Sequence, residues 1–148
     1  IVFHTGFYGE LSPDAAYELV VEELKAVLAE TADFSPTLRP EVLGKSSQFG
    51  ALDELLQLCR ELPLLPCIDF SHLHARTGQF NTFAEFGGVL DKVESALGRE
   101  AAENLHLHIS GIDYGPKGER KHLLLAEADF NYEELMAALL MQRTYLKK

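Results

Sequence analysis

Apolar residues along the chain alternate between short continuous runs, typical of buried strands, and longer stretches with three- and four-residue spacing, typical of helices. The short runs predict four strands, at Ile1–Thr5, Thr37–Leu43, Leu65–Phe70 and Leu105–Ser110. The spaced stretches predict four helices, one beginning near Pro13, one over Leu52–Leu62, one over Thr82–Leu97 and one beginning near Tyr132. The polar segments 71–81 and 111–122 are predicted to be loops.

The same spacing predicts which side of each helix is buried. The first helix is expected to turn inward Ala16, Leu19, Val20, Leu24, Val27 and Leu28. Later helices are expected to bury Phe83, Phe86, Leu90, Val93 and Leu97, and then Leu135, Met136, Leu139 and Leu140. These positions are assigned to the core and carry no functional prediction.

Strands that alternate with helices indicate a parallel sheet covered by helices. Such a sheet stays open or closes into a barrel, and in both cases ligand groups gather at the carboxyl ends of the strands. Because no strand is followed by a glycine-rich nucleotide fingerprint, we predict an α/β fold of the (β/α)8 TIM-barrel type. A full barrel needs roughly 250 residues. The chain is therefore expected to form one domain, 1–148, a partial barrel of about four to five β/α units.

The composition, with 47% hydrophobic residues and two cysteines, predicts a globular domain without a disulfide framework. Cys59 and Cys67 are expected to be reduced thiols in the core. No apolar run approaches the ~20 residues that span a bilayer, and we expect a cytoplasmic monomer without membrane contact. Because a buried strand opens the chain and a helix runs off its end, we expect a segment of a longer protein, the C-terminal half of a barrel.

A histidine or a carboxylate stands near the carboxyl end of every predicted strand. In chain order these residues are His4, Glu41, Asp69 with His72, His106 with His108, and His122 in the loop that follows. Because imidazole and carboxylate are ligands of zinc, manganese and iron, the sequence predicts one shared metal site. His106 and His108 face the same side of their strand. His108, nearer the strand's end, is the better ligand, and His74 is expected to lie in a loop.

Two kinds of chemistry fit such a site. A cation lowers the pKa of the water it binds toward neutrality, and several cations together suit phosphoester hydrolysis. A cation can also polarise a sugar carbonyl while carboxylates move protons. A phosphodiesterase and a sugar isomerase or epimerase are both open at this point, with metal binding alone as a third interpretation.

Five segments resemble the endonuclease IV family of apurinic/apyrimidinic endonucleases, within the xylose isomerase-like barrels. They read FHTGFYG, PEVLGKSSQFG, CIDFSHLHA, LHLHISGIDYG and KGERKHLLLAEADF. The resemblance, which is to the divergent archaeal-type members, covers His4 to Leu139. It implies a zinc-dependent hydrolase of DNA repair that cuts the phosphodiester 5′ to abasic sites in double-stranded DNA. It also implies up to three zinc ions, with manganese possible.

The resemblance further implies roles for single residues. Glu41 would be the catalytic carboxylate that bridges two metals, and the other ligands would be His4, Asp69, His72, His108 and His122. The family's Asp-x-His motif reads Arg120-Lys121-His122 here, with Glu119 as the nearest acid, so coordination of a third zinc stays open. Two further family ligands, an earlier histidine and a final glutamate, have no counterpart in this sequence.

Basic and aromatic residues in the loops beside these ligands are predicted to contact DNA. Lysine and arginine bind phosphates without reading the bases. The predicted DNA-binding residues are Lys45, Arg76, Lys117, Arg120, Lys121 and Tyr114. The net charge of −10 argues against a general nucleic-acid coat, but acidic residues on the outer helix faces leave room for a local basic patch.

Overall fold

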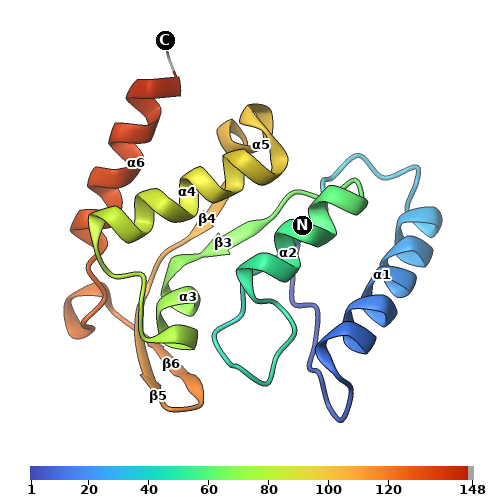
Figure 1. Cartoon of the computed structure of the whole chain (residues 1–148), viewed down its shortest axis with the longest axis horizontal. Coiled ribbons are helices and arrows are strands. Elements are labelled where there is room, and N and C mark those ends of the chain that lie inside the picture. The colour runs from blue at the N-terminus through green and yellow to red at the C-terminus, as the bar shows by residue number, and fades with distance from the viewer. Residues whose placement is uncertain (147–148) are drawn as a thin grey trace.

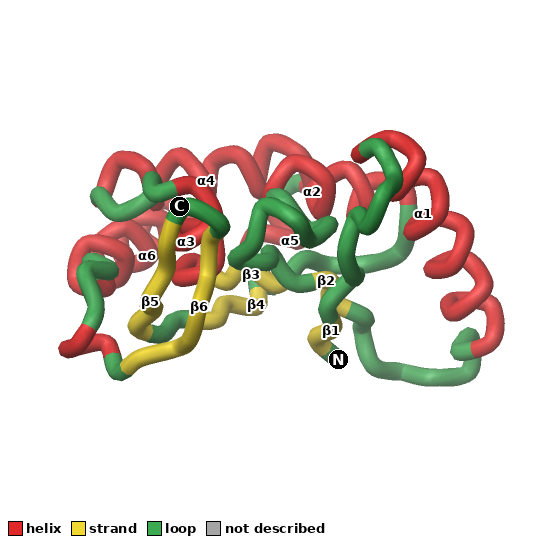
Figure 2. Tube along the Cα trace, turned by 90° about the horizontal axis from the view of Figure 1, so that it is seen from below, coloured by secondary structure: helices red, strands yellow, loops and turns green. Residues whose placement is uncertain are grey.

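Four short parallel strands lie side by side in chain order. In the computed structural model, which describes the backbone of residues 1–146 and the side chains of residues 1–141, they are β1 (Val2–Phe3), β2 (Arg39–Pro40), β3 (Cys67–Asp69) and β4 (His106–His108). β1 pairs with β2 and β3 with β4, and a parallel bridge from Glu41 to Cys67 joins the two pairs. The helices lie over one side of the strands (Figure 2). This arrangement is consistent with part of a barrel, and the described residues do not close a full one.

The helices follow the strands along the chain (Figure 1). They are α1 (Pro13–Glu30), α2 (Leu52–Glu61), α3 (Phe70–Thr77), α4 (Phe83–Leu97), α5 (Arg99–Glu103), the 3-10 turn η1 (Leu125–Glu127) and α6 (Tyr132–Leu146). α1 begins where Ser12 accepts the backbone N–H of Ala15, and α4 begins at a capping box of Thr82 and Glu85. Among the described residues, none of the helices is both long and apolar enough to cross a membrane.

Both predicted loops contain regular structure. Segment 71–81 was predicted to be a loop, but its first part forms α3, because Asp69 caps the helix by accepting the backbone N–H of His72. Segment 111–122 forms the antiparallel hairpin of β5 (Gly111–Gly115) and β6 (Gly118–Leu123). The turn at Gly118 bridges to Lys45 in the loop after β2. The hairpin is thereby held against the carboxyl ends of the parallel strands.

The core lies between the strands and the helices that cover them. Its fully buried side chains include Val42, Leu55, Leu58, Ile68, Phe70, Phe86, Val93 and Leu135. Phe70 and Phe86 meet edge to face, with ring centroids 5.6 Å apart, which ties α3 to α4. α3 is thus anchored by its apolar side while its first turn faces the strand ends.

Five residues predicted to face the core are exposed instead. They are Leu19, Val27, Phe83, Met136 and Leu140. In α1 the buried residues are Ala16, Val21 and Leu24. Apolar residues extend around much of this helix, and spacing alone does not tell which part of a wide apolar arc turns inward.

Candidate metal centre

The register of the parallel strands places four chemically reactive side chains at one level across the sheet. The pairing of β1 with β2, continued by one residue, sets His4 beside Glu41. Glu41 pairs with Cys67, and Cys67 pairs with His106. Neighbours in register project from the same face of a sheet. His4, Glu41, Cys67 and His106 therefore form a row across β1 to β4.

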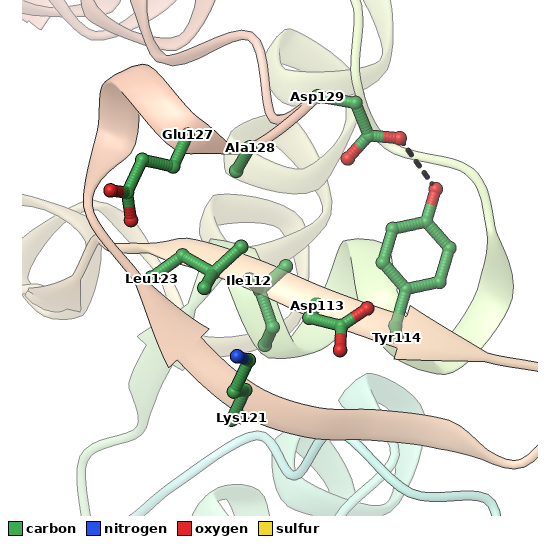
Figure 3. Close-up of a pocket in the computed structure, with 8 residues that line it drawn as sticks. All are labelled: Ile112, Asp113, Tyr114, Lys121, Leu123, Glu127, Ala128 and Asp129. Atoms are coloured by element: carbon green, nitrogen blue, oxygen red, sulfur yellow. Dashed lines mark hydrogen bonds between the residues drawn. The ribbon is translucent and has the colours of Figure 1, made fainter.

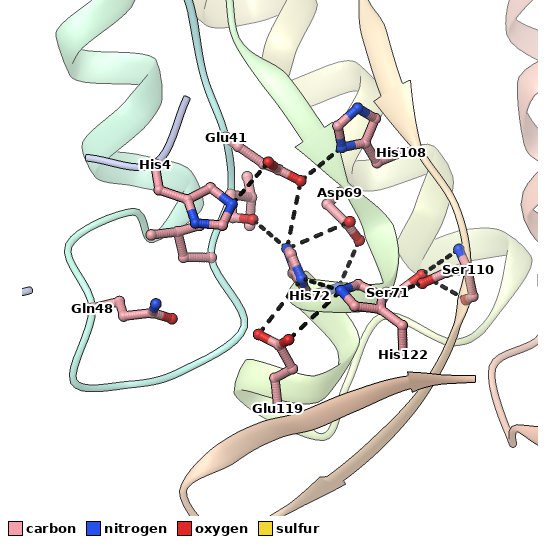
Figure 4. A network of polar contacts seen from close by, with 12 residues as sticks. His4, Glu41, Gln48, Asp69, Ser71, His72, His108, Ser110, Glu119 and His122 are labelled. Atoms are coloured by element: carbon pink, nitrogen blue, oxygen red, sulfur yellow. Dashed lines mark hydrogen bonds and ion pairs between the residues drawn. The ribbon is translucent and has the colours of Figure 1, made fainter. Parts of the chain in front are cut away.

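Asp69 and His108 occupy the next level on the same face. They pair with each other, two residues beyond Cys67 and His106. Residues two apart on a strand share a face, so the two side chains stand next to the row, nearer the carboxyl ends. Figure 4 shows Glu41, Asp69 and His108 directed toward one another.

Glu41 lies at the centre of the arrangement, and its side chain is almost fully buried. Its Oε2 lies 3.1 Å from His4 Nε2, and its Oε1 lies 2.7 Å from His108 Nδ1. A buried carboxylate is costly to desolvate unless N–H donors or positive charge surround it. The two imidazoles supply such donors, and a bound cation would supply the charge.

His72 enters the site from the first turn of α3. Its Nδ1 lies 3.0 Å from the carbonyl oxygen of Val42 and 3.4 Å from Asp69 Oδ2. Because a carbonyl oxygen can only accept, this contact assigns the ring N–H to Nδ1 and leaves the lone pair of Nε2 facing the site. Asp69 is itself buried, and this burial raises the pKa of its carboxyl, partly offset by the nearby His72 ring.

The hairpin contributes His122 and Glu119, which a shift of register brings to the same face. His122 pairs with Ile112 and Glu119 pairs with Tyr114, so Arg120 is left without a partner on the opposite strand. Ile112 and Tyr114 share a face, and their partners therefore share one too, although they are three residues apart. Arg120 is the extra residue of a β-bulge, a device that redirects side chains.

These hairpin residues meet His72. His72 Nε2 lies 3.3 Å from His122 Nε2, and each of these nitrogens lies 3.6 Å from a carboxylate oxygen of Glu119. On the other side of the His122 ring, Nδ1 lies 2.8 Å from Ser110 Oγ. Gly44 permits the close approach, because a Cβ there would lie 2.7 Å from Glu119 Cβ and 3.1 Å from the His72 ring.

The donor atoms form three groups, and within each group all ligand atoms lie within 4.8 Å of one another. The groups are Glu41 with Asp69 and His108, His72 with Glu119 and His122, and Cys67 with His106 and His108. Two imidazole nitrogens bound to one tetrahedral ion at ~2.0 to ~2.1 Å are roughly 3.3 to 3.4 Å apart, and His72 Nε2 and His122 Nε2 lie 3.3 Å apart. The first two groups are nitrogen and oxygen sets that suit zinc or manganese. The nitrogen and oxygen atoms of these residues are therefore suitable ligands for bound cations.

The structure brings the six predicted metal ligands together in this centre, and their role as ligands stays a prediction. Sequence reasoning named Glu119 as the nearest acid but did not place it in the site, because nothing in the sequence indicates the bulge at Arg120. It assigned Cys67 to the core only, although the spacing of two from Asp69 places both on one face. The spacing of two residues could therefore have indicated Cys67 as a candidate ligand.

Of the two remaining histidines, His74 lies where the sequence did not indicate. His74 was predicted to be a loop residue, but it is buried inside α3, with Nδ1 2.7 Å from the carbonyl oxygen of Gln79. The loop prediction failed because the cap at Asp69 extends helical structure through this segment. His106 is exposed on β4, and its Nε2 lies 3.3 Å from His108 Nε2.

The predicted DNA-binding residues divide into two sets. Arg76 and Tyr114 bond within the protein: the Arg76 guanidinium donates to the carbonyl oxygens of Leu43 and Lys45, and Tyr114 Oη donates to Asp129 at 2.8 Å. Arg76 thus supports the loop after β2.

The other set is placed in loops and on the hairpin. Lys45 lies at the bridge to Gly118, and Lys117 is exposed in the hairpin turn. Arg120 lies 3.7 Å from Asp113. Lys121 lines a hollow of about 440 Å³ together with Tyr114 and Asp129 (Figure 3). DNA contact by these residues stays a prediction.

The chain is similar to one protein family and to several curated proteins. Residues 1–145 match the family described as Xylose isomerase-like TIM barrel. An uncharacterized protein of Methanocaldococcus jannaschii is 46% identical over 142 residues, 94% of this chain and 52% of that protein. A probable endonuclease 4 of a Geobacillus species is 29% identical over 126 residues, 82% of this chain and 40% of that protein. A probable endonuclease 4 of Aquifex aeolicus is 25% identical over 123 residues, 80% of this chain and 44% of that protein.

The fold agrees with a solved structure. The crystal structure titled AsfvAP:AG aligns with a TM-score of 0.57 and 16% identity, over 98% of this chain and 50% of that chain. At this identity the likeness shows the fold alone. The chain spans about half the length of the curated relatives it matches. Because the family match extends over nearly all of the sequence, this chain belongs to the Xylose isomerase-like TIM barrel family.

Proposed function

We propose that this chain carries the metal centre of a monomeric DNA-repair phosphodiesterase that hydrolyses the bond 5′ to abasic sites in double-stranded DNA. The observation that carries the proposal is a pair of adjacent groups of candidate cation ligands, with His72 lying between them (Figure 4). His72 Nδ1 lies 3.7 Å from Glu41 Oε1, while its Nε2 faces His122. Neighbouring cations suit phosphodiester hydrolysis because the attacking and the leaving oxygen both need charge stabilisation.

Zinc, or alternatively manganese, is the cation that we propose. The bound cations would act as Lewis acids on the phosphate and activate a water molecule at neutral pH. They would be held by His4, Glu41, Asp69, His72, His108 and His122, with Glu119 in place of the aspartate of the family's Asp-x-His motif. Glu41 is the proposed bridging carboxylate, since its two oxygens face different ring partners.

Other residues hold these ligands in position. Ser110 Oγ lies 2.8 Å from His122 Nδ1, and with a cation bound at Nε2 of that ring the Nδ1–H would donate to this hydroxyl. The backbone of Ser110 is fixed in turn, because its N–H donates to Ser71 Oγ at 2.9 Å and its carbonyl oxygen accepts from the same hydroxyl at 2.7 Å. Such outer partners set ring orientation in metal sites.

The DNA side of the proposal rests on the loops beside the centre. The loop after β2 carries Lys45, and the hairpin carries Lys117, Arg120 and Lys121. The bridge between Lys45 and Gly118 brings these two segments together. We propose that their cationic side chains contact phosphates, while Arg76 and Tyr114 support the segments that present them. The similarity to two proteins named probable endonuclease 4 supports the same substrate class.

The experiment is an incision assay with the full-length protein, zinc or manganese, and a duplex with one abasic site. We expect a single cut 5′ to that site and none in the undamaged duplex. Glu41→Gln should abolish the cut because it removes a negative charge at the cations, and Glu22→Gln on the exposed side of α1 should not.

Two outcomes would contradict the proposal. If the wild-type protein leaves the duplex intact and instead interconverts an aldose and a ketose, the site belongs to a sugar isomerase. If Glu41→Gln keeps full incision while the fold is unchanged by circular dichroism, Glu41 is not the bridging carboxylate.

A further inference from the structure

Cys67 lies in the row of reactive side chains, yet the proposed reaction does not use it. It is paired between Glu41 and His106 and is fully buried. A thiol in this environment is a poor nucleophile. A bound cation is what converts such a thiol to a thiolate, since a coordinating thiol loses its proton outright.

His106 provides a second and independent observation. Its Nε2 lies 3.3 Å from His108 Nε2, and the two rings stand at 76° with centroids 5.1 Å apart. The nitrogen separation equals that of His72 and His122, and it is the separation expected for two imidazoles on one tetrahedral ion. The Cys67 sulfur lies within 4.8 Å of one ring nitrogen of each of the two histidines.

We propose that Cys67, His106 and His108 form a further cation site, which shares His108 with the group of Glu41 and Asp69 and takes a thiophilic cation such as zinc. One sulfur and two nitrogens are a soft ligand set, different in kind from the nitrogen and oxygen sets beside it. Binding forms one metal–sulfur bond and two metal–nitrogen bonds and releases the thiol proton to solvent. No electron transfer is involved.

His108 connects this site to the rest of the centre. Its Nδ1 lies 2.7 Å from Glu41, while its Nε2 faces His106. A neutral imidazole has one lone pair for a cation, because its other nitrogen carries the proton. His108 therefore binds a cation through Nδ1 with Glu41 and Asp69, or through Nε2 with Cys67 and His106. This competition rests on the proposed function, whereas the thiolate site itself does not.

The experiment uses cobalt(II) as the probe, because a cobalt–thiolate bond gives a near-ultraviolet charge-transfer band that nitrogen and oxygen ligands do not give. The full-length protein, freed of metal and kept reduced, is titrated with cobalt(II). We expect the band in the wild-type protein and its loss in Cys67→Ser. Cys59→Ser on α2 is the matched control and should keep the band.

His106→Ala tests the second ligand at an exposed position where truncation leaves the core intact. We expect cobalt(II) to bind at least about tenfold more weakly when measured by the thiolate band. Absence of the band in the wild type, its persistence in Cys67→Ser, or unchanged affinity in His106→Ala would each overturn the proposal. The incision assay on the same samples is read separately, so a thiolate band without incision supports this site and counts against the proposed function.

Discussion

Two of the regions that supply the candidate ligands, the parallel strands and the hairpin, are built in different ways. The parallel strands fix Glu41 and Asp69 by pairing, and each of these side chains is buried. The hairpin brings Glu119 and His122 to the same centre, but only through a register shift of one residue. In the parallel sheet, the face on which a side chain lies follows from alternation along its strand. In the hairpin, that face also depends on the position of the bulge.

This difference limits how far a motif can be transferred by its spacing. At the strand end, Asp69 and His72 keep an Asp-x-x-His spacing, because a helix cap fixes one relative to the other. In the hairpin, the acid is three residues before His122 and still shares its face, because Arg120 is the unpaired residue. The fold therefore brings an acidic side chain to the face of His122, although this acid does not stand at the position that the motif gives it.

The largest effect is expected from exchanging the acid between the two hairpin positions. The double variant Glu119→Arg with Arg120→Asp restores an Asp-x-His spacing in the sequence. We expect it to lose the cation held with His72 and His122, because the side chain at position 120 lies toward Asp113 and Gly115. Zinc content per protein, measured by elemental analysis, should fall by one ion.

Deleting Arg120 is the matched control. Without the extra residue, Glu119 and His122 are two apart on a regular strand and still share a face. We expect the deletion variant to keep the ion that the double variant loses. The reverse result, with the ion kept in the double variant and lost on deletion, would show that the bulge does not direct Glu119 to the site.

A smaller effect is expected from separating the hairpin from the sheet. Gly118 has a φ of 93°, and a Cβ there would lie 2.1 Å from the carbonyl oxygen of Gly44. Gly118→Ala combines backbone strain with a clash against main chain, so we expect the free energy of unfolding to fall by at least about 2 kcal/mol. Urea denaturation followed by circular dichroism measures it.

Gly9→Ala separates the two causes. Gly9 also has a positive φ, 61°, but a Cβ there would meet nothing within 4 Å. We expect Gly9→Ala to lower the free energy of unfolding only by the cost of the backbone strain, about 1 kcal/mol. Equal losses in the two variants would mean that the hairpin contact at Gly44 contributes nothing to stability.

The sequence predicted the fold type and the places of the four parallel strands because both follow from local periodicity, although each observed strand is shorter than predicted. The run Leu65–Phe70 led to Asp69, and the alternation of β4 placed His108 beside it. Positions that depend on nonlocal contacts were not predictable. Glu119 joins the site through such a contact, the strand pairing that leaves a bulge. α3 was missed for a different reason, because its cap, from Asp69 to the backbone of His72, is a local signal that the sequence analysis did not use.

The prediction of which helix faces are buried failed for a related reason. Leu19 and Val27 match the helical spacing, yet they are exposed, while Val21 is buried. Sequence spacing predicts an apolar arc, and the tertiary packing then selects which part of it turns inward. The same distinction applies to the site: periodicity gives the residues that can reach one edge, and pairing across elements decides which of them touch.

The smallest effect is expected at Ser110, where the sheet and the hairpin meet. Ser110→Ala removes the hydroxyl that lies 2.8 Å from His122 Nδ1 but keeps both bonds from the Ser110 backbone to Ser71. The fold should therefore persist while the His122 ring loses its orientation, and zinc should bind about tenfold more weakly, or ~1.4 kcal/mol. Competition with a fluorescent chelator measures this affinity, and Ser95→Ala on the exposed side of α4 should match the wild type. If the affinity of Ser110→Ala also equals that of the wild type, the ring is held by Glu119 and His72 alone, and the hairpin orients its own ligand without help from the sheet.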